Sequence, residues 1–267
     1  MASVLAWIGD GLIAARDLLY PPVCAACGEE TGAAAGLCSA CFAETTFLAE
    51  PLCARCGAPV PGHAGEADAA RLCDACAVAP PLFDRARAAA LYEGAARRAA
   101  LQLKHADRLD VARSVAPWML RAGREMVAAA DVVAPAPLHW RRLAARRFNQ
   151  AAELGRRVAE AAGRREAFLP DLLVRRRATP PQEGLSRAGR FENVADAFAV
   201  RPRRADRVAG ARVLLIDDVI TTGATLSACA AALKAAGAAR VEALALARVA
   251  RPDAGLYLTR LEEGERS

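Results

Sequence analysis

The stretch VLLIDDVITTGATL, residues 213–226, has the pattern of a buried strand followed by a loop and the start of a helix. Its four leading apolar residues predict a strand of the parallel, fully buried kind. Asp217 and Asp218 come next, and ligands of such sheets bind beyond the carboxyl ends of the strands. Two acidic side chains would be costly there if they were buried without partners. We therefore expect both carboxylates to accept hydrogen bonds from the hydroxyl groups of a sugar.

The residues after the two acids have the features of an anion site. A helix is expected to begin here, and the unpaired backbone N–H groups at a helix start attract an anion. Threonine hydroxyls add donors, and glycine allows close approach of the backbone. The residues concerned are Thr221, Thr222, Gly223, Ala224 and Thr225. The two aspartates can accept hydrogen bonds from the ribose hydroxyls, and the residues after them can bind a phosphate. Together they fit one ribose 5-phosphate group, which is the ligand that we predict.

Strands and helices alternate around this loop. We expect strands at residues 86–92, 132–136, 211–217 and 241–249, and helices at residues 95–105, 112–126, 149–162 and 225–236. Alternation of this kind implies right-handed crossovers, so residues 81–250 are expected to form an α/β domain with a mostly parallel sheet flanked by helices. Residues 251–267 are expected to form a C-terminal tail.

The first third of the 267-residue chain is a small Cys-rich module, expected to occupy residues 1–80 together with an N-terminal helix. Eight of the nine cysteines lie here as C-x2-C pairs, and four thiolates make one closed tetrahedral zinc site. Two structural zinc sites are therefore predicted, with an iron–sulfur cluster as the alternative. Sequential and crossed pairing of the turns both remain open. The ligands are Cys24, Cys27, Cys38, Cys41, Cys53, Cys56, Cys73 and Cys76.

The start of the chain has apolar residues at helical spacing, interrupted by Asp10, Arg16 and Asp17. We expect a helix that packs on its own protein rather than a membrane anchor, and no basic region of a secretion signal precedes its apolar part. The chain has no stretch that is long and apolar enough to cross a bilayer. These features, with cysteines spaced for metal, predict a cytoplasmic protein, because thiols stay reduced in that compartment.

Residues 213–226 resemble the phosphoribosyl-diphosphate motif of type I phosphoribosyltransferases. Three further segments resemble the ComF family, which includes competence proteins and the GntX-like group. Residues 135–150, PAPLHWRRLAARRFNQ, resemble its P-x-P-L…R…R-x-F-N-Q signature, although Arg147 stands where the family often has glycine. Residues 179–198 resemble its T-x-x-Q…L…R…N…AF stretch, and residues 103–105 resemble its L-K-Y/F element. With the cysteine module, the similarity covers nearly the whole chain.

The resemblance implies a type I phosphoribosyltransferase-like fold behind a double zinc ribbon. It implies that Asp217 and Asp218 hold the ribose hydroxyls, directly or through Mg²⁺, and that residues 221–225 bind the 5-phosphate. Residues 175–198 resemble the mobile loop that folds over substrate in this class. The remaining candidates for binding phosphoribosyl diphosphate are His139, Arg141, Arg142 and Arg146 in the expected pyrophosphate loop, Gln182 and Arg190 in the mobile loop, and Lys104. Cys229 is expected to be a buried thiol.

Three hypotheses for function follow. The first is Mg²⁺-dependent transfer of phosphoribose to an unknown acceptor, and the second is a sensor of phosphoribosyl diphosphate without turnover. The third is a non-enzymatic accessory of DNA uptake or repair that binds single-stranded DNA or DNA-uptake proteins. Residues 136–207 hold 17 arginines against 8 acidic residues, which suits phosphates but also fits a generally Arg-rich composition. Aromatic residues make up 5% of the chain, which is few for stacking on the bases of single-stranded DNA. The sequence identifies no residue as a general base for the enzymatic hypothesis.

Overall fold

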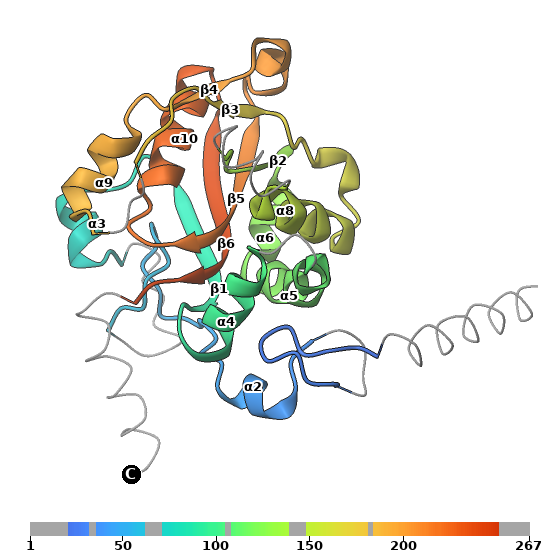
Figure 1. The fold of residues 1–267 in the computed structure, drawn as a ribbon. Coiled ribbons are helices and arrows are strands. Elements are labelled where there is room, and N and C mark those ends of the chain that lie inside the picture. The colour runs from blue at the N-terminus through green and yellow to red at the C-terminus, as the bar shows by residue number, and fades with distance from the viewer. Residues whose placement is uncertain are drawn as a thin grey trace, which may run out of the picture.

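The computed structural model describes residues 21–31, 36–61, 71–104, 108–138, 148–180 and 184–250. Its main sheet has four strands, all parallel, in the order β1-β6-β5-β2 (Figure 1). The strands are β1 (Arg85–Leu91), β2 (Val132–Pro135), β5 (Arg212–Ile220) and β6 (Arg240–Arg248). The expected parallel α/β fold is therefore confirmed.

Helices cover both faces of this sheet, and each face has its own hydrophobic core. On one face lie α4 (Gly94–Gln102), α5 (Leu109–Ala122), α6 (Arg124–Ala129) and α8 (Gln150–Ala161). On the other lies α10 (Ala224–Ala235), packed against the antiparallel pair β3 (Leu173–Arg175) and β4 (Phe198–Val200) and against α9 (Arg187–Val194). Short 3-10 turns occupy Arg165–Ala167 and Pro202–Arg207. Among the described residues, no helix combines the length and apolar character that a bilayer span requires.

The structure corrects three local expectations. Residues 175–198 are not one loop, because the segment contains α9, whose N-cap Ser186 accepts a hydrogen bond from the Gly189 N–H, and it ends in the pairing of β3 with β4. The helix expected at residues 112–126 is broken at Gly123, where a side chain would meet Leu244 at 2.8 Å. The strand expected to end at residue 217 continues to Ile220, since its pairing with β6 continues to the same point.

The cysteine module contains α2 (Ser39–Ala43) and α3 (Asp74–Val78), and its two halves differ in how they join the α/β domain. Cys24 and Cys41 belong to a small separate core that Ala95 of α4 completes. Cys53, Cys56 and Cys76, in contrast, belong to the large core that also holds α10. The second half therefore folds as part of the α/β core.

Substitution of Gly57 by alanine tests this integration. Gly57 has φ +67°, and an added Cβ would lie 2.5 Å from the Ala86 carbonyl oxygen in β1. Gly28 is the matched control, since it has φ +81° in the equivalent turn and nothing within 4 Å of an added Cβ. The left-handed backbone costs both variants about 1–2 kcal/mol. We expect Gly57→Ala to lose roughly 1–3 kcal/mol more, from the clash. Equal denaturation midpoints of the two variants would contradict the prediction.

Candidate functional site

The two acidic residues of β5 point to opposite faces of the sheet. Side chains alternate along a strand, and Val213 and Leu215 lie in the core beneath α10, whereas Leu214 and Ile216 lie in the core beneath α8. Asp217 therefore faces α10 and Asp218 faces α8. The strand was expected to end at Asp217, but both residues lie within it, half-buried. The helices on both faces of the sheet, α8 and α10, therefore each lie next to one of the two carboxylates.

Asp218 is held from the side of α8. The Gln150 side chain, which is 6% exposed, donates from Nε2 to the Asp218 carboxylate at 3.2 Å. Asn149 caps the helix by accepting from the Ala151 N–H at 3.0 Å and donates to the Ala136 carbonyl at 3.1 Å, which fixes the helix start beside the end of β2. The Gln150 Oε1 atom is buried and accepts no hydrogen bond from the described residues. An acceptor in need of a donor therefore lies beside the carboxylate.

Asp217 occupies an environment that opposes its charge. Burial and the neighbouring Asp218 charge raise the pKa of Asp217 well above its usual value, while Arg175 of β3 acts in the opposite direction. Arg175 stacks on the Phe198 ring at 5.3 Å and donates to the Thr179 hydroxyl. Burial likewise raises the pKa of the Cys229 thiol on α10, which confirms the expected buried cysteine. Arg175 was not among the residues chosen from the sequence.

The phosphate loop, residues 221–223, for which the sequence predicts phosphate binding, follows β5 directly and ends at the start of α10. Gly223 is the N-cap of α10 and has φ +80°, a left-handed conformation that side chains rarely adopt. Phe83, which is fully buried, lies beneath it, 3.3 Å from where a Cβ would stand. The Thr222 hydroxyl accepts from the Ala224 N–H at 3.3 Å. A helix start carries the positive end of the helix dipole, so this end of α10 suits an anion.

The other candidates chosen from the sequence are less well placed. His139, Arg141, Arg142, Arg146 and Gln182 lie outside the described residues. Lys104 is half-buried just after the C-cap of α4, and Arg190 donates to the Leu185 carbonyl beside its own helix. Their contacts with a ligand remain predictions. The structure adds Arg175 to the site, and it places beside Asp218 the Gln150 side chain, for which the sequence left a ligand contact and a helix cap or backbone contact equally open.

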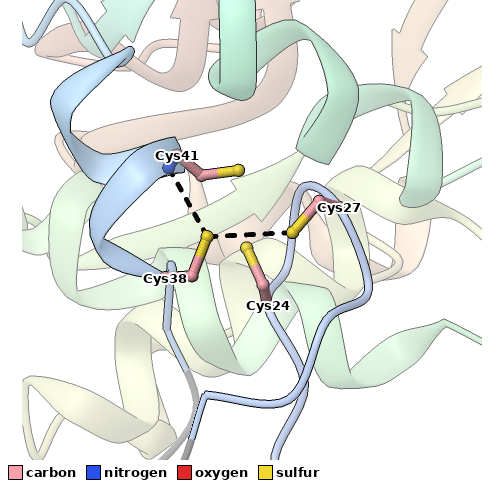
Figure 2. A group of neighbouring side chains, drawn as sticks. All are labelled: Cys24, Cys27, Cys38 and Cys41. Carbon is pink, nitrogen blue, oxygen red and sulfur yellow. Dashed lines mark hydrogen bonds between the residues drawn. The ribbon is translucent and has the colours of Figure 1, made fainter.

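The cysteines form two groups of four, and within each group the sulfur atoms all lie within 4.8 Å of one another. Cys24, Cys27, Cys38 and Cys41 make the first group (Figure 2), and Cys53, Cys56, Cys73 and Cys76 make the second. The pairing is therefore sequential. Zn–S bonds of 2.3 Å give tetrahedral S···S separations of about 3.8 Å. The Cys27–Cys38 and Cys56–Cys73 separations are 3.8 Å and 3.7 Å, so these donor sets fit zinc.

Comparison with known proteins agrees with this architecture. A model of the double zinc ribbon domain matches residues 15–77, and a model of the phosphoribosyl transferase domain matches residues 150–255. The fold and the cysteine clusters thus define a phosphoribosyltransferase-domain protein with a double zinc ribbon.

Curated relatives give the family. The DNA utilization protein YhgH of Salmonella typhi and that of Salmonella typhimurium are each 31% identical over 181 residues, covering 66% of this chain and 77% of the relative. Competence protein F of Haemophilus influenzae is 33% identical over 121 residues, covering 44% of this chain and 50% of that protein. The chain belongs to the ComF family.

The charge of Asp217 should be measurable as a stability effect. The pKa of Asp217 is higher in the folded protein than in the unfolded chain. At pH values above the unfolded-state pKa, the ionised carboxylate therefore destabilises the fold. Asp217→Asn should therefore stabilise the ligand-free protein, with a gain that grows as the pH rises above about 4, the pKa of an unfolded Asp, and levels off above the folded-state pKa. About 1 kcal/mol corresponds to a melting-temperature shift of about 2–4 °C at this size. Asp206→Asn, at an exposed site, is the control. A gain that is constant with pH would refute the assignment.

Proposed function

We propose that this protein binds phosphoribosyl diphosphate with Mg²⁺ at the carboxyl end of β5. The observation that carries the proposal is the succession, within one strand and one helix start, of two carboxylates and a loop whose Gly223 has a left-handed conformation at the positive end of α10. Asp217 and Asp218 would accept from the ribose hydroxyls or from water on the metal. Thr221, Thr222, Gly223, Ala224 and Thr225 would surround the 5-phosphate.

The residues at this site suit the metal as well as the sugar. Mg²⁺ prefers carboxylate and other oxygen ligands and keeps several of its waters. The two carboxylates and the buried Gln150 Oε1 supply such acceptors. When bound, Mg²⁺ would offset the charge of the pyrophosphate as a Lewis acid. His139, Arg141, Arg142 and Arg146 remain our candidates for the pyrophosphate, and Gln182, Arg190 and Lys104 for further contacts.

Transfer to an acceptor is the enzymatic form of the proposal. The bond between the ribose C1 and pyrophosphate would break, a bond from C1 to the acceptor would form, and pyrophosphate would leave. The alternative is a sensor that binds the same ligand without turnover. Release of pyrophosphate that depends on an added acceptor distinguishes the two, and we assign no general base among the described residues.

Calorimetry tests the binding proposal. Wild-type protein should bind phosphoribosyl diphosphate when Mg²⁺ is present, and chelation of Mg²⁺ should weaken binding. Asp218→Asn should weaken it by about tenfold or more, because hydrogen bonds to a charged acceptor contribute about 1.5–3 kcal/mol. Asp206→Asn is again the control. Equal affinity of wild type and Asp218→Asn would remove the basis of the proposal.

Binding of single-stranded DNA is a second candidate function. The relatives' names refer to DNA utilization and competence, and a groove of about 330 Å³ is lined by Arg85, Arg87, Arg121 and Arg124 against two glutamates. Arg121 and Arg124 are exposed, and such side chains suit a phosphate backbone. Proteins of DNA uptake are the other partners that we propose.

Gel-shift titration of a single-stranded oligonucleotide tests this second function. Affinity should fall steeply as salt rises, and the double substitution Arg121→Ala with Arg124→Ala should reduce the salt slope by about 1–2. Arg203→Ala, an exposed arginine outside the groove, serves as the control. The absence of a shift at low salt would refute DNA binding by this protein.

Two broader expectations also remain proposals. We place the boundary of the zinc ribbon module near residue 80 and that of the α/β domain near residue 250. We also propose a cytoplasmic location, because the two clusters of four free cysteines require reduced thiolates to hold metal.

A further inference from the structure

Two buried arginines reach the second cysteine cluster from the α/β domain. Arg248, at the end of β6, is 1% exposed, and its guanidinium donates to the Cys56 carbonyl. Arg87, in β1, is 8% exposed and donates to the Cys53 carbonyl at 3.3 Å. Both acceptors are backbone groups of the turn that carries two of the four sulfur ligands. Both arginines are brought there by the sheet, from distant parts of the chain.

The charge of a filled site explains why cations are buried there. Four thiolates around one Zn²⁺ leave two negative charges in excess. Cys53, Cys56 and Cys76 are buried, so water screens that charge poorly. A buried charge is tolerated when an opposite charge and hydrogen bonds accompany it. The Arg87 and Arg248 guanidinium groups bring positive charge to this turn, and Arg87 also forms an ion pair with Glu50 at 3.4 Å.

Arg248 also lies beside the phosphate loop. It pairs in register with Ile220, the last residue of β5, and the Val249 N–H donates to the Ile220 carbonyl at 2.9 Å. Thr221 follows directly. A second link passes through Phe83, which belongs to the same core as the buried cysteines and lies beneath Gly223. A disturbance at the second cluster therefore reaches the loop from two sides.

We propose that Arg87 and Arg248 are positioning residues that compensate the charge of the second zinc centre, and that zinc at this centre keeps the phosphate loop in its binding conformation. The first centre has no such role. Its Cys27 is exposed, and its buried Cys24 and Cys41 lie in a small core that includes no residue of β5, β6 or α10. Its neighbour Ala25 packs in the core on the α8 face, away from α10. Its cation, Arg98, donates to the Cys41 sulfur at 3.4 Å from a partly exposed position. The two zinc ions then have different functions: one shapes the site, and the other stabilises the periphery.

Stepwise removal of zinc from the full-length chain tests the proposal without any ligand. A colorimetric chelator follows the release of the two ions, native mass spectrometry counts those that remain, and Cys27→Ser identifies the phase that belongs to the first centre. Amide hydrogen exchange is measured at residues 219–227. Exchange there should be unchanged after loss of the first zinc and should rise by about tenfold or more after loss of the second, as expected for local opening.

Variants with matched controls separate the arginines from the metal. Arg248→Met and Arg87→Met should each speed release of the second zinc by about 10–100-fold, the usual effect of losing a group that supports metal ligands. Arg98→Met should affect the first zinc alone. Arg207→Met, at an exposed position, should affect neither. If Arg248→Met does not fold, zinc release from Arg87→Met and chelation of the wild type still test the proposal.

Two outcomes would overturn the proposal. One is unchanged exchange at residues 219–227 after the second zinc has left. The other is release of the second zinc at the wild-type rate from both arginine variants that fold. Neither result depends on phosphoribosyl diphosphate, so failure here is distinguishable from failure of the proposed function.

Discussion

Asp217 and Asp218 are consecutive residues of one buried strand, so their carboxyl groups leave the sheet on opposite faces and each face must accommodate a charge. On the α8 face, Gln150 donates to Asp218. On the α10 face, Arg175 counters part of the burial of Asp217. The elements that carry these partners follow from this constraint. Helix α8 must begin beside the end of β2, and β3 must pack close to α10.

The same physics recurs at the zinc ribbon, with the signs of charge reversed. At β5 the protein buries carboxylates, and the described residues offset only part of the free-energy cost of burying their charge. This suits a site that a metal or a sugar completes. At the second cysteine cluster it buries guanidinium groups, and the net negative charge of a zinc ion with four thiolates would offset the cost of burying them. The two regions are neighbours at the carboxyl ends of the two central strands, because Ile220 and Arg248 pair across β5 and β6. A structural metal can thereby support a ligand site that it does not touch.

The sequence predicts those features that depend on near neighbours. The C-x2-C spacing indicates two clusters, and the order of acids, threonines and Gly223 indicates the loop. The sequence alone does not decide whether Asn149 and Gln150 cap a helix or belong to the ligand site, because their roles depend on where β2 ends. Contacts between distant residues are beyond local patterns. Arg248 and the Cys56 carbonyl are 192 positions apart, and Phe83 reaches Gly223 only through the sheet order. The extension of β5 past Asp218 likewise depends on β6, since two aspartates favour a strand poorly.

The raised pKa of Asp217 also bears on what the site is for. A protein gains no stability from an ionised carboxylate held beside a second one in a buried strand, and many substitutions there would relieve the repulsion. Such a local cost is typical of ligand sites, where the ligand supplies the missing interactions. A divalent cation or a set of hydroxyl donors would relieve this cost. The electrostatics of β5 therefore agree with the proposed ligand, while the choice between binding and transfer depends on groups beyond this strand.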